Sequence, residues 1–143
     1  MRIGIALAAL LTFAALQMPL KEADAATSEA ERAKICEEAE ARYQDLFGKP
    51  SKDEPVTIVK MYKYTFCPAV LKVKQGTTVR WVNVDKRTSH SVWFKEQGKE
   101  ESDRLFSEEN VELKLDFPPG DLGYLCGPHH EKEGMKARII ITE

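Results

Sequence analysis

The stretch Tyr124-Leu-Cys126-Gly-Pro-His129-His130-Glu-Lys-Glu-Gly-Met135 lies near the C-terminus and runs directly into the apolar segment Ala137-Arg-Ile139-Ile140-Ile141. One thiol, two imidazoles and one thioether therefore share a single loop between two segments that have the composition of strands. A soft thiolate combined with imidazole and a weak thioether suits copper that alternates between Cu(I) and Cu(II) better than zinc, which rarely takes methionine. The stretch is therefore predicted to be a copper-binding loop.

The missing ligand should be a second imidazole from another part of the chain, and the only histidine outside this loop is His90. His90 follows the polar turn Asp85-Lys-Arg-Thr88 and opens the next strand-like segment. Only a fold that brings two non-adjacent strand ends to one pole can join His90 to Cys126. A β-sandwich does so, because its loops cluster at the two ends of its sheets.

Short segments rich in β-branched and aromatic residues follow one another from residue 56 to the C-terminus, separated by turn sequences. Strands at this spacing predict an all-β fold, an antiparallel β-sandwich. The predicted strands are 56–64, 69–74, 77–84, 91–94, 111–117, 123–126 and 137–142.

Residues 28–47 are predicted to form a helix ahead of the sandwich. Ser28 and Glu31 have the spacing of a capping box, acidic residues crowd the first turns, and Gly48 and Pro50 end the pattern. The helical period places Cys36 on the buried face. We therefore expect residues 26–55 to be a helical extension and linker, and residues 56–143 to be the sandwich domain.

Residues 1–25 have the pattern of a signal peptide, with a positive start, an apolar core over residues 3–16 and the small-x-small site Ala23-Asp-Ala25. The apolar core is too short to span a bilayer comfortably. We expect cleavage near Ala25, export to a periplasm and no membrane association afterwards. An uncleaved N-terminal anchor is the alternative.

Export affects the three cysteines, because an oxidising compartment favours paired or metal-bound thiols. If Cys126 is a metal thiolate, Cys36 and Cys67 remain for a disulfide that would fasten the helix to the sandwich. Two separately buried thiols are the alternative.

Composition narrows the function. The net charge of −2 shows no basic excess that would indicate nucleic acid binding. The sequence has no evident nucleophile with a partnered base, no glycine-rich phosphate loop and no identifiable carboxylate pair, so we expect a protein that is not an enzyme. An accidental grouping of a buried cysteine, surface histidines and a methionine is the alternative to a metal site.

The pattern Pro119-Gly120...Tyr124-x-Cys126-x-Pro128-His129...Gly134-Met135, with Asn83...His90 upstream, resembles the cupredoxins or type 1 copper proteins, particularly plastocyanin and pseudoazurin, over about residues 56–143. The resemblance implies an eight-stranded Greek-key β-sandwich with one copper held by His90, Cys126, a second histidine and an axial Met135. The segment Thr88-Ser-His-Ser-Val-Trp-Phe94 also looks like that of periplasmic copper-tolerance cupredoxins of the CopI type.

The loop departs from plastocyanin-like spacing by one residue. His129 keeps the expected distance from Cys126 but lies one residue too far from Met135, and His130 does the reverse. We favour His129, because the Gly-Pro pair after Cys126 makes a tight turn and the family places its histidine directly after that proline. His130 would then be a surface or supporting group.

A second departure is Ser91, which follows the first histidine where the family commonly has Asn. Its backbone N–H could still donate to the Cys126 sulfur and tune the reduction potential.

The same site permits two functions. The first is a monomeric carrier of single electrons whose partner is a periplasmic c-type cytochrome or another redox protein, with the edge of His129 as the electron exit. The second is a copper-tolerance protein that sequesters or oxidises Cu(I) without a dedicated electron-transfer partner.

Overall fold

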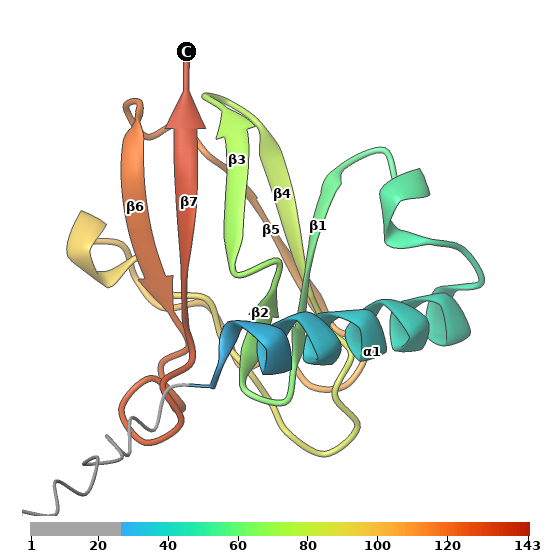
Figure 1. The fold of residues 1–143 in the computed structure, drawn as a ribbon. Coiled ribbons are helices and arrows are strands. Elements are labelled where there is room, and N and C mark those ends of the chain that lie inside the picture. Colours follow the sequence, from blue (N-terminus) through green and yellow to red (C-terminus); the bar gives the residue numbers. More distant parts are fainter. Residues whose placement is uncertain (1–26) are drawn as a thin grey trace, which may run out of the picture.

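The computed structural model describes residues 27–143, so the predicted signal peptide over residues 1–25 lies outside the described residues. The first element is the helix α1 (Glu29–Phe47), which lies across the lower part of the sandwich in Figure 1. Ser28 is its N-cap, with Oγ accepting a hydrogen bond from the backbone N–H of Glu31. The helix ends at Gly48, whose φ of 74° is a left-handed conformation that glycine adopts without steric cost. The predicted helix is confirmed.

Seven strands form two sheets after the short 3₁₀ turn η1 (Ser51–Asp53). One sheet has the order β2-β1-β4-β5 and the other β3-β7-β6. The strands are β1 (Thr57–Tyr62), β2 (Thr65–Cys67), β3 (Val70–Lys74), β4 (Thr78–Asn83), β5 (Asn110–Lys114), β6 (Gly120–Leu125) and β7 (Lys136–Thr142). The predicted β-sandwich with an N-terminal helix is therefore confirmed.

The expectation of a wholly antiparallel sandwich is wrong for two strand pairs, since β1 pairs with β4 and β3 pairs with β7 in parallel. The reason lies in the connections between sheets. After β2 the chain crosses to the other sheet as β3 and then returns as β4. This crossover brings β4 back beside β1 in the same direction.

Two hydrophobic clusters lie on opposite faces of the first sheet. In β1, Val59 and Met61 belong to the cluster between the two sheets, whereas Ile58 belongs to the cluster beneath α1. This alternation explains why the middle of β1 is buried on both faces. The cluster between the sheets includes Val79, Trp81, Tyr124, Ile139 and Ile141.

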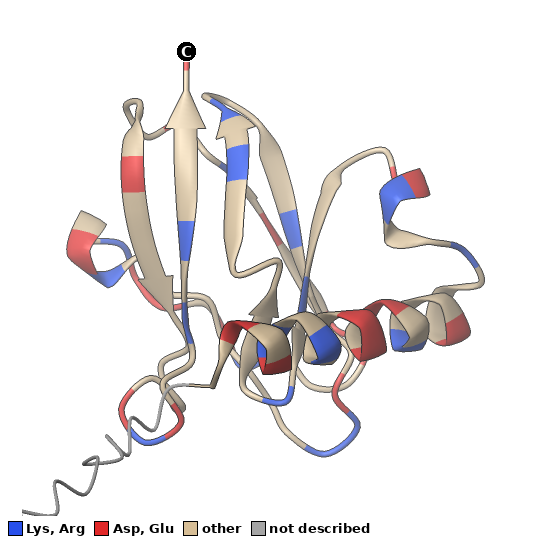
Figure 2. Cartoon of the chain, viewed as in Figure 1, with Lys and Arg blue, Asp and Glu red and all other residues tan. Residues whose placement is uncertain are grey.

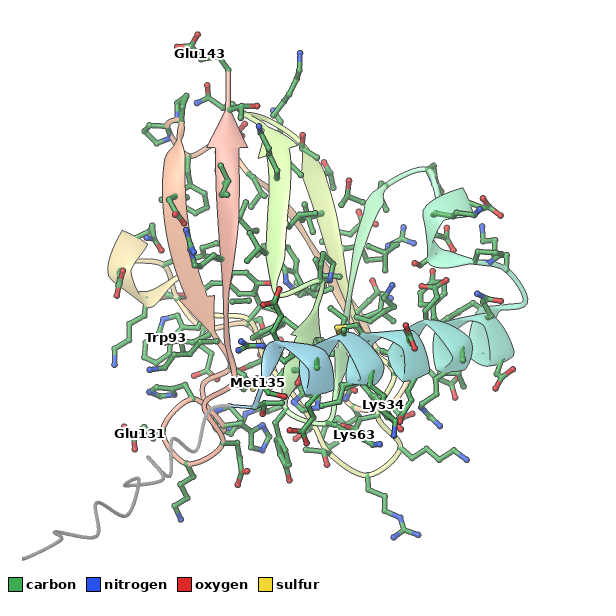
Figure 3. The ribbon with its side chains drawn as sticks, viewed as in Figure 1. Lys34, Lys63, Trp93, Glu131, Met135 and Glu143 are labelled. Atoms are coloured by element: carbon green, nitrogen blue, oxygen red, sulfur yellow. A yellow bond between two sulfur atoms is a disulfide. The ribbon has the colours of Figure 1, made fainter. Side chains whose placement is uncertain are left out.

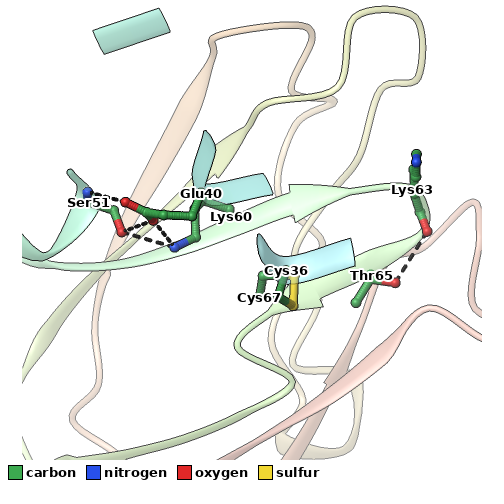
Figure 4. Close-up of a disulfide and its surroundings, with 7 residues drawn as sticks. All are labelled: Cys36, Glu40, Ser51, Lys60, Lys63, Thr65 and Cys67. Carbon is green, nitrogen blue, oxygen red and sulfur yellow. Dashed lines mark hydrogen bonds and ion pairs between the residues drawn. A yellow bond between two sulfur atoms is a disulfide. The ribbon is translucent and has the colours of Figure 1, made fainter. Parts of the chain in front are cut away.

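The helix α1 is fastened to the first sheet by covalent, polar and apolar contacts. Cys36 and Cys67 form a disulfide (Figure 4), so they are not two separate thiols. The carboxylate of Glu40 accepts hydrogen bonds from Lys60 Nζ at 2.6 Å and Ser51 Oγ at 2.5 Å. These contacts make the extension an integral layer over β1 and β2.

The predicted strand over residues 91–94 is not formed as a strand, and the described residues contain seven strands where the family resemblance implied eight. His90 and Trp93 instead make isolated bridges to two different segments, at Leu105 and Leu125. The backbone N–H groups of the two residues between them donate hydrogen bonds to side chains instead of to a neighbouring strand. Val92 N–H donates to Ser102 Oγ at 2.9 Å, and Ser91 N–H donates to Cys126 Sγ at 3.4 Å.

A short strand that was not predicted, β2, follows a tight turn that ends β1 at Tyr62, two residues before the end of the predicted strand over residues 56–64. Lys63 and Tyr64 both have positive φ, 46° and 57°. This conformation is uncommon for residues other than glycine. The turn folds β2 back onto β1 and brings Tyr64 to the end of the sandwich where the histidines lie.

Within residues 27–143, no helix is both long and apolar enough to cross a membrane.

Candidate metal centre

Three predicted ligand residues, His90, Cys126 and His129, come together at one end of the sandwich. Their ligand atoms lie within 4.8 Å of one another, although they come from two separate parts of the chain. Cys126 directly follows β6, and His129 lies in the tight turn after it. His90 lies in the segment that leaves β4. The sandwich therefore closes the sequence gap between His90 and Cys126, as expected.

The distances between these atoms match the size of a metal ion. The Cys126 sulfur lies 3.4 Å from His129 Nδ1 and 3.9 Å from His90 Nδ1. Metal–sulfur and metal–nitrogen bonds of about 2.3 and 2.0 Å at tetrahedral or trigonal angles place the two ligand atoms about 3.5–3.7 Å apart. A thiol and two imidazole Nδ1 atoms thus surround a space that fits one ion, and this donor set suits copper.

The loop from Cys126 to Met135 is closed by backbone hydrogen bonds. Cys126 N–H donates to Met135 O, and Met135 N–H donates to His129 O, both at 3.1 Å. Met135 is 1% exposed and lies just before β7 (Figure 3). These bonds hold the backbone of Met135 beside the two candidate ligand residues of the loop, Cys126 and His129.

His130 lies outside the group formed by His90, Cys126 and His129. Its Nδ1 is 2.8 Å from the carbonyl oxygen of Gly127, a distance at which the ring donates a hydrogen bond to the backbone. Its ring lies edge-on to Trp93, with the centroids 6.4 Å apart. The geometry therefore places His129, and not His130, beside the thiol.

His90 is fully buried and has a carboxylate partner that sequence reasoning missed. Its Nε2 lies 3.2 Å from Asp85 Oδ2, and the same oxygen accepts a hydrogen bond from Lys63 N–H at 2.9 Å. A proton on Nε2 leaves Nδ1 free to face the metal. Burial alone lowers the pKa of His90, but the hydrogen bonds to Asp85 and Cys126 outweigh burial and raise this pKa.

The turn that carries Asp85 is held by Asn83, the fully buried last residue of β4. Its side-chain amide donates to the carbonyl oxygens of Thr88 and Leu105, each at 2.8 Å. Its amide oxygen accepts from Asp85 N–H, also at 2.8 Å. Asn83 thus fixes the chain on both sides of the turn before His90.

His129 is only partly buried and is flanked by Tyr64, another residue that sequence reasoning did not single out. Tyr64 is 40% exposed, and its ring lies edge-on to that of His129, with the centroids 4.9 Å apart. Partial burial, together with the positive charges of His90 and Arg104, lowers the pKa of His129. This histidine is therefore the member of the group that reaches the surface.

The fully buried Cys126 sulfur accepts a hydrogen bond from Ser91 N–H at 3.4 Å, as the sequence predicted. The Ser91 hydroxyl makes its own contacts, to Glu101 Oε1 at 2.6 Å and Gly127 N–H at 2.9 Å. No sequence signal marked Glu101, because it lies in a charged loop after the turn η2 (Lys95–Gln97).

Comparisons with known proteins agree with this donor set. The model of the plastocyanin/azurin family of copper binding proteins matches residues 54–142. An oxidised amicyanin variant is 22% identical over 62% of this chain and 84% of its own, with a TM-score of 0.55. Amicyanin from Paracoccus versutus is 22% identical over 64% of this chain and 88% of its own, with a TM-score of 0.53.

A copper-containing nitrite reductase from Thermus scotoductus is 29% identical over 67% of this chain, with a TM-score of 0.53, but the match covers only 24% of the reductase. The similarity therefore concerns one part of that enzyme.

Proposed function

The chain belongs to the plastocyanin/azurin family of copper binding proteins, as its resemblance to the cupredoxins predicted, and we propose that it carries single electrons in a periplasm. The observation that carries this proposal is the group of His90, Cys126 and His129 at one end of the sandwich. When bound, copper supplies a one-electron couple between Cu(I) and Cu(II).

In this proposal His90 Nδ1, Cys126 Sγ and His129 Nδ1 would hold the copper, and the Met135 thioether would be a weaker fourth ligand. Two imidazoles, one thiolate and a weak thioether are the donor set of type 1 copper sites. The Asp85 carboxylate holds His90 in the tautomer that presents Nδ1.

Backbone hydrogen bonds across the Cys126–Met135 loop, and the burial of His90, keep the ligand-bearing residues in place. A fixed ligand set suits electron transfer, because a change in metal charge then demands little rearrangement of the chain. The exposed edge of His129 is the electron exit, and Tyr64 lies beside that exit.

The proposed partner is another exported redox protein, such as a c-type cytochrome, that meets a monomer of this chain. Six acidic and three basic residues are interspersed along α1, as Figure 2 shows, so the helix carries charges of both signs. The predicted signal peptide supports export, and an exported protein would meet redox partners in the periplasm. Failure to exchange electrons with any periplasmic cytochrome would count against the carrier role.

The test of the copper site is the visible and electron paramagnetic resonance spectrum of purified protein after addition of Cu(II). The wild type should develop an intense thiolate-to-copper band. His129→Ala should abolish the band, whereas the matched control His130→Ala should retain it. A protein without the band in any form would refute the proposed site, and the reverse result for the two variants would assign the ligand to His130.

Copper tolerance is the second candidate function, favoured by the segment from Thr88 to Phe94 that looks like copper-tolerance cupredoxins. In that role the same residues would sequester or oxidise Cu(I). Copper-induced expression and copper sensitivity on deletion of the gene would favour tolerance. A respiratory or photosynthetic defect at low copper would favour electron transfer.

A further inference from the structure

The Ser91 hydroxyl lies between two groups that can accept its single proton. Glu101 Oε1 is 2.6 Å from Ser91 Oγ, and the Cys126 sulfur is 3.9 Å from the same oxygen. A third neighbour, Gly127 N–H, donates to Ser91 Oγ at 2.9 Å and therefore does not compete for the proton.

Of the two acceptors, the carboxylate of Glu101 receives the hydrogen bond from the Ser91 hydroxyl. A hydroxyl donates to one acceptor at a time, and a short bond to a charged oxygen is stronger than a long bond to sulfur. The hydroxyl proton therefore points away from Cys126, and the only hydrogen bond that Ser91 donates to the sulfur is the one from its backbone N–H.

The fold places Glu101 at this position although its side chain is at the surface. Ser102, its neighbour, pairs with Val92 through Ser102 N–H to Val92 O at 3.0 Å and Val92 N–H to Ser102 Oγ at 2.9 Å. The carboxylate also lies against Gly127, where a Cβ would overlap it. The absence of a side chain at Gly127 thus leaves room for the carboxylate beside the metal loop.

Hydrogen bonds to a metal-bound cysteine sulfur draw electron density from the metal–sulfur bond and favour the reduced ion, and a nearby negative charge favours the oxidised ion. We propose that Glu101 is a positioning residue that lowers the copper reduction potential by holding the Ser91 hydroxyl proton away from Cys126. This inference rests on the proposed function, since it concerns the same copper site.

The test measures the reduction potential of the copper-loaded protein by spectroelectrochemistry. Glu101→Ala frees the hydroxyl to donate to Cys126, so the Cu(I)/Cu(II) ratio at a fixed applied potential should rise about tenfold, which is about 59 mV. Glu101→Gln removes the charge but keeps an acceptor for the hydroxyl, so the ratio should rise only about threefold. The matched control is Glu100→Gln, which neutralises the adjacent residue and should leave the reduction potential equal to that of the wild type.

The Ser91→Ala background separates the hydroxyl from the charge. Without the hydroxyl, replacing Glu101 by Ala or by Gln should give the same potential. In metal-free protein, Glu101→Ala should also shift the amide resonances of Ser91 and Gly127 in the ¹H–¹⁵N spectrum, because the hydroxyl between them changes its partner.

The possible results distinguish failure of the proposal on Glu101 from failure of the proposed copper site. Equal potentials for Glu101→Ala and Glu101→Gln in the presence of Ser91 would overturn the proposal, since only the charge would then act. An unchanged Gly127 resonance in metal-free Glu101→Ala would overturn it too. Loss of the charge-transfer band from every protein, wild type included, would instead refute the proposed copper site.

Discussion

The disulfide between Cys36 and Cys67 is predicted to contribute a large part of the stability of this small domain. It joins α1 to the end of β2 across a sequence separation of 31 residues. In the chain-entropy relation, closing a loop of that length costs the unfolded chain about 12 cal/mol/K, or about 3.7 kcal/mol at 25 °C. Removing the link should therefore lower the free energy of unfolding by roughly this amount.

The double variant Cys36→Ala/Cys67→Ala tests this value. Cys67 is 1% exposed, so loss of its sulfur leaves a small cavity and adds about 1 kcal/mol to the destabilisation. Guanidinium denaturation should show the combined loss, and the melting temperature should fall by about 20 °C. The visible spectrum of the copper-loaded variant should be unchanged, because the proposed metal thiolate is Cys126.

The single variants Cys36→Ala and Cys67→Ala are the controls, because loss of either sulfur opens the loop completely. Each should lie within about 1 kcal/mol of the double variant. A double variant destabilised by less than about 1 kcal/mol would refute the reasoning. The contacts of Ala39, Tyr43 and Glu40 would then be sufficient to hold the helix in place.

Three further predictions concern polar contacts. Partial burial raises the pKa of Glu40, but hydrogen bonds from Lys60 and Ser51 outweigh burial and lower this pKa from 4.5 to about 2. The stabilisation of the fold by the ionised Glu40 is therefore complete above pH 4.5 and is lost as the pH falls toward 2. Glu40→Gln should lower the free energy of unfolding by about 1 kcal/mol at pH 7, allowing for solvent screening. In acid denaturation, the difference in stability between this variant and the wild type should vanish. Asn83→Ala leaves two carbonyl oxygens and one N–H without their partner, so chemical denaturation should show a loss of about 3 kcal/mol. Asp85→Asn weakens the partner of His90, so copper affinity in a competition titration should fall about tenfold or more, with the charge-transfer band retained.

Each of these three predictions has an opposing outcome. A Glu40→Gln variant whose deficit persists unchanged at low pH would disprove the ionic origin of its contribution. An Asn83→Ala variant as stable as the wild type would show that water replaces the lost partners. Unchanged copper affinity in Asp85→Asn would show that burial alone orients the His90 ring.

Several features could be predicted from the sequence because their causes are local. The helix cap at Ser28 and the glycine that ends the helix depend on neighbours a few residues away. The alternation of apolar and polar residues in β7 is likewise local, as its burial pattern shows. The prediction of a strand over residues 91–94 failed because its backbone donors turn to Ser102 and Cys126, contacts that no local pattern contains.

The donor set could be predicted without any fold, since a thiol, two imidazoles and a thioether in one loop, with one distant histidine, point to copper. The tertiary structure was needed to show that His129, and not His130, faces the thiol. It also brought Asp85, Tyr64 and Glu101 to the site. The physical reason is that ligand chemistry belongs to single residues, whereas hydrogen bonds between distant loops depend on how two sheets pack and on where their connections meet.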